Sequence, residues 1–167
     1  MGKNTLDHHA AFEVLFQQYP VSKFLEFGLG AGTQFFLDRC SHVTSIELAW
    51  SNDRKWFNRC QTGYRNYQNW DAQFFMLPET ICAAEKDIRA DKGNAVYHAA
   101  QLWEKDLEAV VKQFVRIDTY DLVFVDPGTH LRADIVNFLF DRGIFAVCCC
   151  RRSWSTRRDV GIGIRNS

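Results

Sequence analysis

The chain has 167 residues, which is the length of one ordinary domain. Hydrophobic residues make up 47% of it and charged residues 24%, with 10 glycines and 3 prolines, so a disordered or collagen-like chain is excluded. Basic and acidic side chains balance at 20 each, and this balance argues against a protein that coats nucleic acid through its overall charge.

The charge is nevertheless uneven along the chain. Residues 151–167 hold five arginines and one aspartate, whereas residues 1–150 hold 15 basic and 19 acidic side chains. The basic tail is interpreted either as a solvated end or as a patch for an anionic substrate. We expect a single domain over 1–167, made of an N-terminal helix (1–20), a core (21–150) and this tail.

Apolar runs and cysteines indicate the environment of the protein. No apolar run reaches the roughly 18–20 residues that span a bilayer, and residues 1–20 lack the basic start of a signal peptide. The six cysteines have no spacing typical of zinc, and the run Cys148-Cys149-Cys150 is typical of a buried strand in a reducing compartment. We therefore expect a cytoplasmic protein with no membrane association and no metal site.

The first half of the chain alternates strands with helices. The expected elements are a helix at 7–18, a strand at 23–27, a glycine-rich turn at 28–32, a helix at 33–40, a strand at 41–48 and a helix at 51–60. Pro20 ends the first helix, and Ser51 is expected to cap the last one. This alternation predicts a parallel sheet with crossover helices.

The second half continues the pattern on both sides of a mainly helical interval. The expected elements are a strand at 72–77, helical segments within 79–117, a strand at 120–126, a helix at 131–143, a strand at 144–150 and an edge strand at 160–164. The run YDLVFVD at 120–126 is continuously apolar up to its final acid, which is typical of a strand buried on both faces.

The glycine-rich turn is the first candidate site. It reads Glu26-x-Gly28-x-Gly30-x-Gly32, between a strand and a helix. Glycines allow a tight turn and let a ligand approach the backbone without a Cβ in the way, although such a turn can also be purely structural. The dinucleotide-binding loop has the spacing G-x-G-x-x-G, which is one residue longer.

Polar residues at two further strand ends add to this site. Glu47 ends the second strand, where a carboxylate can accept both ribose hydroxyls or simply lie on the surface. Asp126 and His130 follow the strand at 120–126, at the edge where open α/β sheets bind ligands. They can deprotonate a substrate hydroxyl or bind a metal; alternatively, Asp126 caps the next helix and His130 packs.

Two segments resemble the class I S-adenosylmethionine-dependent methyltransferases. KFLEFGLGAGTQFFL followed by VTSIEL looks like the glycine motif and the acidic motif of that family. YDLVFVDPGTHLRADIVNFLFDRGIFAV resembles the fourth-strand segment of its small-molecule O-methyltransferase-like members. The resemblance covers about residues 20–150 and implies an α/β fold, a Rossmann-like three-layer sandwich with a mostly parallel central sheet that is short or truncated at the C-terminal end.

The resemblance also implies S-adenosylmethionine as the cofactor and assigns roles to residues. In the family the first acid lies near the methionine amino end, the glycine loop passes against the cofactor, and the second acid holds the ribose. The cofactor-binding residues implied in this way are Glu26, Gly28, Gly30, Gly32, Glu47 and Asp126. The catalytic residues implied are His130 and Asp126, either of which would serve as the base.

The expected activity is methyl transfer to a small-molecule or sugar oxygen. Nucleic acid is not the expected acceptor, because Asp126-Pro127-Gly128-Thr129 replaces the N-P-P-Y-like tetrad of amino-directed nucleic-acid methylases. An insertion within 79–100 is expected to cover the substrate, with His8, His9 and Trp50 as weaker candidates for the walls of the cleft. The alternatives are a non-catalytic cofactor-binding domain and, with less support, a dinucleotide-binding oxidoreductase. The oligomeric state stays open.

Overall fold

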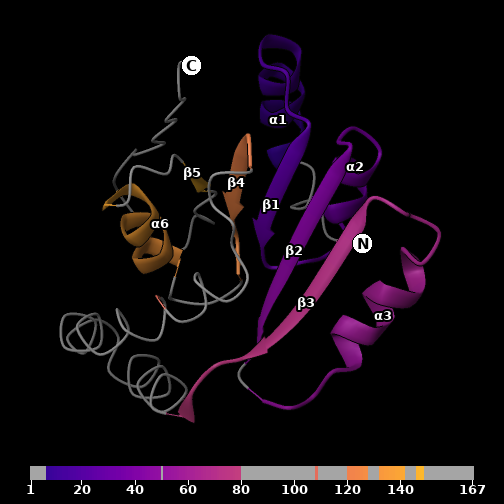
Figure 1. The fold of residues 1–167 in the computed structure, drawn as a ribbon, viewed down its shortest axis with the longest axis vertical. Coiled ribbons are helices and arrows are strands. Elements are labelled where there is room, and N and C mark those ends of the chain that lie inside the picture. Colours follow the sequence, from indigo (N-terminus) through magenta and orange to yellow (C-terminus); the bar gives the residue numbers. More distant parts are fainter. Residues whose placement is uncertain are drawn as a thin grey trace.

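The computed structural model describes residues 7–49, 51–79, 108, 120–127, 132–141 and 146–148. Its elements are α1 (Asp7–Gln18), β1 (Lys23–Phe27), α2 (Thr33–Leu37), β2 (His42–Ala49), α3 (Lys55–Gly63), β3 (Trp70–Met76), β4 (Leu122–Val125), α6 (Arg132–Asp141) and β5 (Ala146–Cys148). The strands form one sheet in the order β3-β2-β1-β4-β5, and every neighbouring pair is parallel (Figure 1). The predicted α/β class with a parallel sheet is confirmed.

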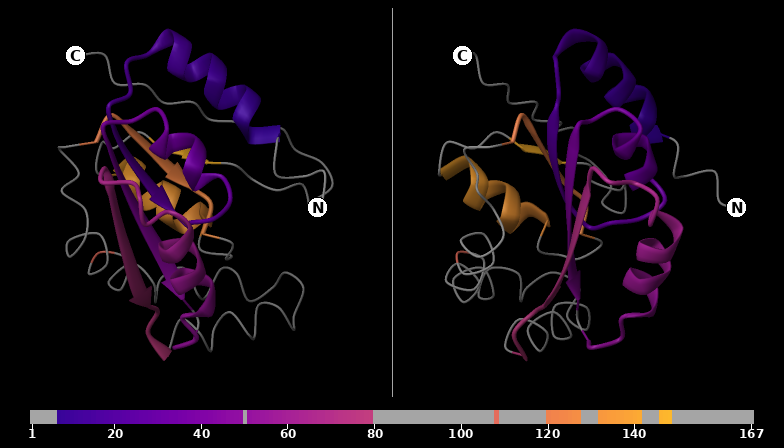
Figure 2. Two further views of the ribbon diagram at one scale, coloured as in Figure 1. Left: turned by 90° about the vertical axis from the view of Figure 1, so that its right-hand side faces the viewer. Right: turned by 45° about the vertical axis from the view of Figure 1, so that its right-hand side comes forward.

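Helices cover both faces of the sheet. Figure 2 shows α1, α2 and α3 on one face and α6 on the opposite face. The strands are therefore buried from two sides, which explains the continuous apolar run in β4, where all four residues are buried. Within the described part of the chain, no helix is long and apolar enough to cross a membrane.

An aromatic cluster joins α1 and α2 to the sheet. Phe36 of α2 stacks on Phe24 of β1 with ring centroids 4.0 Å apart. Phe12 of α1 meets Phe36 edge-on at 4.9 Å and Phe124 of β4 at 5.0 Å. Phe12 is only 3% exposed, so the apolar face of α1 is part of the core. Burying aromatic side chains of this size contributes a large share of the folding free energy.

The structure confirms the predicted helix at 7–18 and the predicted strand at 23–27. The helix predicted at 33–40 is shorter, because α2 ends at Leu37. Beyond Leu37 the Phe36 carbonyl accepts from both the Arg39 N–H at 3.1 Å and the Cys40 N–H at 2.9 Å. A carbonyl shared between three-residue and four-residue spacing is typical of a helix end, and the chain then continues into β2.

The prediction that Ser51 caps a helix over 51–60 is wrong. α3 runs from Lys55 to Gly63, and Arg54 occupies the N-cap position without a side-chain hydrogen bond to the helix. Ser51 Oγ instead accepts from the Asp53 backbone, and Asp53 Oδ1 accepts from the Lys55 backbone. These local side-chain-to-backbone bonds compete with helical hydrogen bonds and delay the start of the helix.

Three of the remaining strands are found with shifted ends, since the expected ranges 41–48, 72–77 and 120–126 become 42–49, 70–76 and 122–125. Of the strand expected at 144–150 the structure describes residues 146–148, which form β5, and the other positions lie outside the described residues. β3 begins early because Trp70 already pairs with Val43 of β2. β4 begins late because Asp121 lies before it and accepts hydrogen bonds from the backbones of Ser22 and Lys23. Near the predicted helix at 131–143, α6 covers 132–141.

Several predictions lie outside the described residues. They concern the helical segments within 79–117 except for Glu79 and Glu108, the expected insertion within 79–100 apart from Glu79, the strand at 160–164, the basic tail, Trp50 and His130. They stay predictions of the sequence.

Candidate functional site

The glycine loop lies where the carboxyl ends of three neighbouring strands meet. β1 pairs with β2 on one side and with β4 on the other. The Gly28 N–H donates to the Ile46 carbonyl at 2.8 Å, and the Asp126 N–H donates to the Phe27 carbonyl at 2.9 Å. The chain leaves β1 for β2 and later returns to the other side of β1, so the loop marks the point where parallel α/β sheets bind their ligands.

Gly28 is required by the protein itself. Its φ is +90°, a conformation that side chains rarely adopt. A Cβ at this position would lie 2.2 Å from the Asp126 carbonyl oxygen and 2.7 Å from Pro127 Cα. The absence of a side chain therefore lets the loop pass directly over the end of β4.

Gly30 and Gly32 are under no such demand. A Cβ at Gly30 would have Trp56 Cζ2 as its nearest described neighbour, at 3.7 Å, and one at Gly32 would have His9 Nε2 at 3.7 Å. Both are ordinary contact distances, and Gly32 has right-handed helical angles. The described protein atoms thus leave space beside both glycines, which fits a loop that a ligand approaches.

Glu26 is buried at the centre of a hydrogen-bond network. Its Oε1 accepts from Thr33 Oγ1 at 2.7 Å and from Ser45 Oγ at 2.6 Å. Gly30 N–H donates to Thr33 Oγ1 at 2.9 Å, and Trp70 Nε1 donates to Ser45 Oγ at 2.8 Å. Each hydroxyl receives one hydrogen bond and gives its own proton to Glu26. The carboxyl therefore ties the loop to α2, β2 and β3.

Burial dominates the ionisation of Glu26. The side chain is 2% exposed, and this desolvation raises the pKa of its carboxyl from 4.5 to about 7. The hydrogen bonds from Ser45 and Thr33 favour the charged form and oppose the rise in pKa, whereas the nearby negative charges of Glu47 and Asp126 add to it. Glu26 thus changes charge near neutral pH.

Glu47 contacts the loop from the end of β2. Its Oε2 accepts from the Leu29 backbone N–H at 3.3 Å, and the side chain is half-buried. Burial raises the pKa of Glu47, and the hydrogen bond from Leu29 opposes that rise. Since a carboxylate has about four acceptor positions, this contact leaves Glu47 able to accept from a ligand as well.

Two side chains of the α3 region hold the carbonyl groups of the loop. Trp56 Nε1 donates to the Leu29 carbonyl at 3.0 Å, and Tyr64 OH donates to the Gly30 carbonyl at 2.8 Å. Both the N–H groups and the carbonyl groups of Leu29 and Gly30 are thereby hydrogen-bonded to side chains.

Asp126 lies directly after β4 and forms an ion pair with Arg132, the first residue of α6. The side chain of Asp126 is 28% exposed and that of Arg132 is 16% exposed. Asp126 therefore binds the side chain of the first helical residue, and this pair occupies one of its oxygens. His130, the other predicted catalytic residue, lies outside the described residues.

The structure thus brings Glu26, Glu47 and Asp126 together around the loop, as the sequence predicted. Several residues that shape the site were not expected to do so: Thr33, Ser45, Trp56, Tyr64 and Arg132. A signal existed for Ser45, because it stands two residues before Glu47 and so shares one face of β2 with it. The contacts of Trp56 and Tyr64 join positions 27 and 34 residues apart and leave no local pattern.

Comparison with known proteins gives no family for the chain. No family model matches the sequence, and no curated protein matches it either. The function is therefore argued from the geometry of the site.

Proposed function

We propose that the chain is a Rossmann-like domain that binds S-adenosylmethionine and transfers its methyl group to a small-molecule acceptor. The strand order β3-β2-β1-β4-β5 agrees with five strands of the doubly wound order 3-2-1-4-5-6. The glycine loop follows β1, and an acid stands at the end of β2, where ribose hydroxyls are bound in such folds. These features support a ligand that contains a nucleoside.

The hydrogen bonds and charges around the loop favour one kind of ligand over another. Loops that bind a pyrophosphate offer free backbone N–H groups to it. Here two N–H groups of the loop are already engaged, since that of Leu29 donates to Glu47 and that of Gly30 donates to Thr33. Glu47 and the partly ionised Glu26 also disfavour a phosphate, whereas the charge of Asp126 is balanced by Arg132. A ligand with a sulfonium and an ammonium group fits this acidic site better than a dinucleotide does.

Each described residue then has a defined role. Glu47 accepts from the ribose hydroxyls with the acceptor positions that Leu29 leaves open. Glu26 is too deeply buried for broad contact with a ligand, so it acts mainly by holding the loop and by its charge. Gly30 and Gly32 have no Cβ that would keep the ligand from the backbone of the loop, and the cofactor would supply a methyl group that is already activated by the sulfonium.

Methyl transfer of this kind depends mostly on positioning, because aligning the acceptor with an activated methyl group supplies much of the acceleration. A base is needed only when an acceptor hydroxyl must lose its proton. Asp126 is engaged by Arg132, so His130 is the better candidate for this role. The proposed acceptor is a small-molecule or sugar oxygen.

Titration calorimetry tests the proposal. We expect S-adenosylmethionine and S-adenosylhomocysteine to bind, and NAD to bind far more weakly or not at all. Binding of NAD alone would contradict the proposal and favour the oxidoreductase.

A second candidate is a non-catalytic domain that binds the same cofactor. The ion pair with Arg132 favours this candidate, because it engages Asp126, a residue that the sequence predicts as a base. The two candidates differ in the fate of the cofactor. The methyl donor is labelled with stable isotopes and incubated with pools of hydroxylated small molecules. Mass spectrometry would then show a labelled, methylated product only if the protein is an enzyme.

A further inference from the structure

The first turn of α1 reaches the glycine loop through His9. The Nε2 atom of His9 lies 3.7 Å from the place that a Cβ on Gly32 would occupy. The imidazole stacks on the Phe35 ring of α2, with centroids 4.8 Å apart and ring planes 20° apart. The side chain is half-buried, so its ring covers Phe35 while part of it stays accessible.

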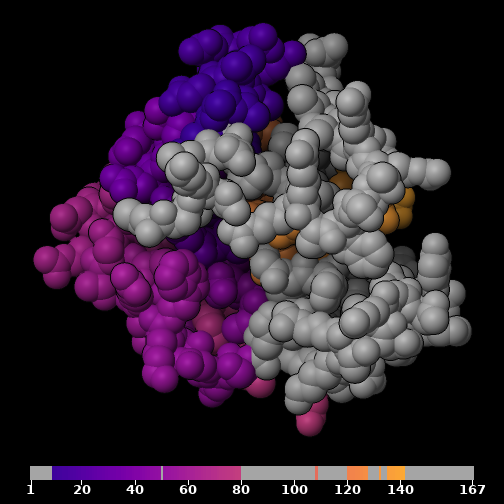
Figure 3. All heavy atoms as spheres, turned by 180° about the vertical axis from the view of Figure 1, so that it is seen from behind, coloured from indigo at the N-terminus to yellow at the C-terminus, as the bar shows by residue number. Residues whose placement is uncertain are grey.

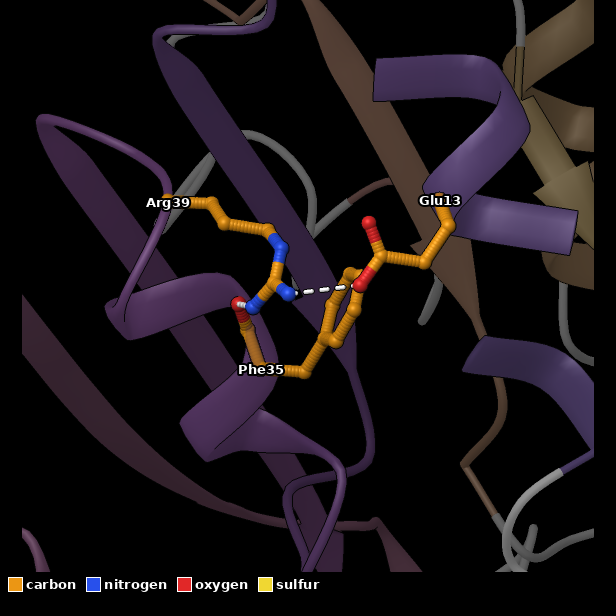
Figure 4. A network of polar contacts seen from close by, with 3 residues as sticks. All are labelled: Glu13, Phe35 and Arg39. Carbon is orange, nitrogen blue, oxygen red and sulfur yellow. Dashed lines mark hydrogen bonds and ion pairs between the residues drawn. The ribbon is translucent and has the colours of Figure 1, made fainter. Parts of the chain in front are cut away.

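α1 is held in this position by contacts one turn further along. Glu13 lies four residues after His9 and therefore on the same helix face. Figure 4 shows Arg39 hydrogen-bonded to Glu13 Oε1 at 2.6 Å and to the Phe35 carbonyl at 3.0 Å. The Arg39 guanidinium also lies 3.7 Å from the Phe35 ring centroid. Together with buried Phe12, these contacts place His9 at the loop.

The surface agrees with this attachment. In the space-filling view of Figure 3, α1 (indigo) adjoins the purple segments that follow β1. α1 is therefore packed close to the glycine loop, against β1 and α2.

The side chains that a ligand can reach differ between the two ends of the loop. Half-buried Glu47 contacts the loop at Leu29, whereas Glu26, which hydrogen-bonds Thr33 next to Gly32, is only 2% exposed. His9 borders the loop at Gly32. Glu47 suits the hydroxyl groups of a ligand, but it would repel a carboxylate. An imidazole N–H is a hydrogen-bond donor that suits a carboxylate.

We infer that His9 binds the carboxylate of the amino-acid part of the ligand that lies over the glycine loop. The inference rests on the proposed function, since it takes S-adenosylmethionine or its demethylated product as that ligand. It makes α1 a wall of the site. His9 is a ligand-positioning residue, and it takes no part in proton transfer.

The experiment compares two ligands that differ in this carboxylate. S-adenosylhomocysteine carries the amino-acid part, whereas 5′-deoxy-5′-methylthioadenosine lacks it. Calorimetry is performed with the full chain as wild type, His9→Ala, His9→Gln and His42→Ala. His42 is an exposed histidine at the amino end of β2, far along the strand from Glu47, and serves as the matched control.

We expect His9→Ala to weaken S-adenosylhomocysteine about tenfold to a hundredfold, as for a lost hydrogen bond to a charged group. Binding of 5′-deoxy-5′-methylthioadenosine should change less than twofold. His9→Gln should recover part of the affinity because it keeps an N–H donor, and His42→Ala should bind both ligands as wild type does.

The other outcomes have distinct meanings. Equal weakening of both ligands by His9→Ala, or no weakening of either, would overturn the inference and leave His9 as a packing residue on Phe35. If the wild type binds neither ligand, the proposed function fails, and the inference fails with it. Thermal unfolding of each variant shows whether the fold is retained; if His9→Ala is unfolded, the comparison of the two ligands with His9→Gln decides.

Discussion

At the scale of single residues, the Glu26 carboxyl links the pH to the stability of the fold. Burial raises its pKa to about 7, well above the 4.5 of an exposed glutamate. The folded state therefore holds the proton more tightly than the unfolded state does. The stabilisation is fully present below pH 4.5 and is lost as the pH rises through 7.

The first prediction concerns the slope of the free energy of unfolding against pH. Between pH 5 and 8 the free energy of unfolding of the wild type should fall by up to about 3 kcal/mol through Glu26. Glu26→Gln should remove this part of the pH dependence, because its amide cannot ionise while its oxygen still accepts from Thr33 and Ser45. Urea denaturation at a series of pH values measures the slope. A variant whose slope equals that of the wild type would show that Glu26 does not titrate in this range.

The second prediction concerns Glu47. In the proposed complex, truncation of this side chain leaves the ribose hydroxyls without their charged acceptor. Glu47→Ala should weaken S-adenosylhomocysteine by about 1.5–3 kcal/mol, or about tenfold to a hundredfold. Calorimetry with Asp71→Asn as control tests this, since Asp71 lies exposed near the amino end of β3. Affinity within a factor of two of the wild type would mean that Glu47 does not contact the ligand.

At the scale of elements, the glycine loop is a joint between β1, α2 and β4. Its glycines differ in the physical reason for which a glycine stands at each position. Gly28 has a positive φ and touches the backbone at Asp126, whereas Gly30 has space for a side chain. The sequence motif alone treats them as equivalent.

A matched pair of variants separates the two reasons. Gly28→Ala should lower the free energy of unfolding by at least about 2 kcal/mol, from its backbone strain and its clash with β4. Gly30→Ala should change it by less than about 1 kcal/mol, because among the described residues its new methyl group meets Trp56 at 3.7 Å, an ordinary contact distance. Urea denaturation compares them. Equal losses would mean that the close approach at Gly28 is not a constraint.

The order of these elements was predictable from the sequence, and their contacts were not. Parallel strands buried on both faces give apolar runs such as LVFV in β4, which are recognisable in isolation. The start of α3 was misplaced because side-chain bonds at Ser51 and Asp53 compete with the helix. The positions of Glu26, Glu47 and Asp126 near one edge of the sheet were predictable, because each lies at or near the end of a predicted strand. The hydrogen-bond partners of Glu26 lie on other elements, so no local sequence pattern predicts them.

At the scale of the whole molecule, ligand and fold are linked by mass action. A ligand that binds only the folded chain raises the free energy of unfolding by about 2.7 kcal/mol at a hundred times its Kd. We expect this rise with S-adenosylhomocysteine in thermal or urea unfolding, and no rise with NAD at the same concentration. Stabilisation by NAD alone would contradict the proposed ligand.

The path of the chain through the sheet also bears on how the protein folds. β1, α2, β2, α3 and β3 follow one another between residues 23 and 76, so their mutual contacts are local. β4 instead joins β1 across a long separation, as the bond between Ser22 and Asp121, 99 residues apart, shows. Closing so long a loop costs entropy before its contacts form, and such pairings are slow. We expect pulse-labelled hydrogen exchange to protect Val43 and Ile46 before Val123 and Val125. Gly28 would then meet the end of β4 only late in folding, and the glycine loop would take its final form after the contacts of β1, β2 and β3 have formed.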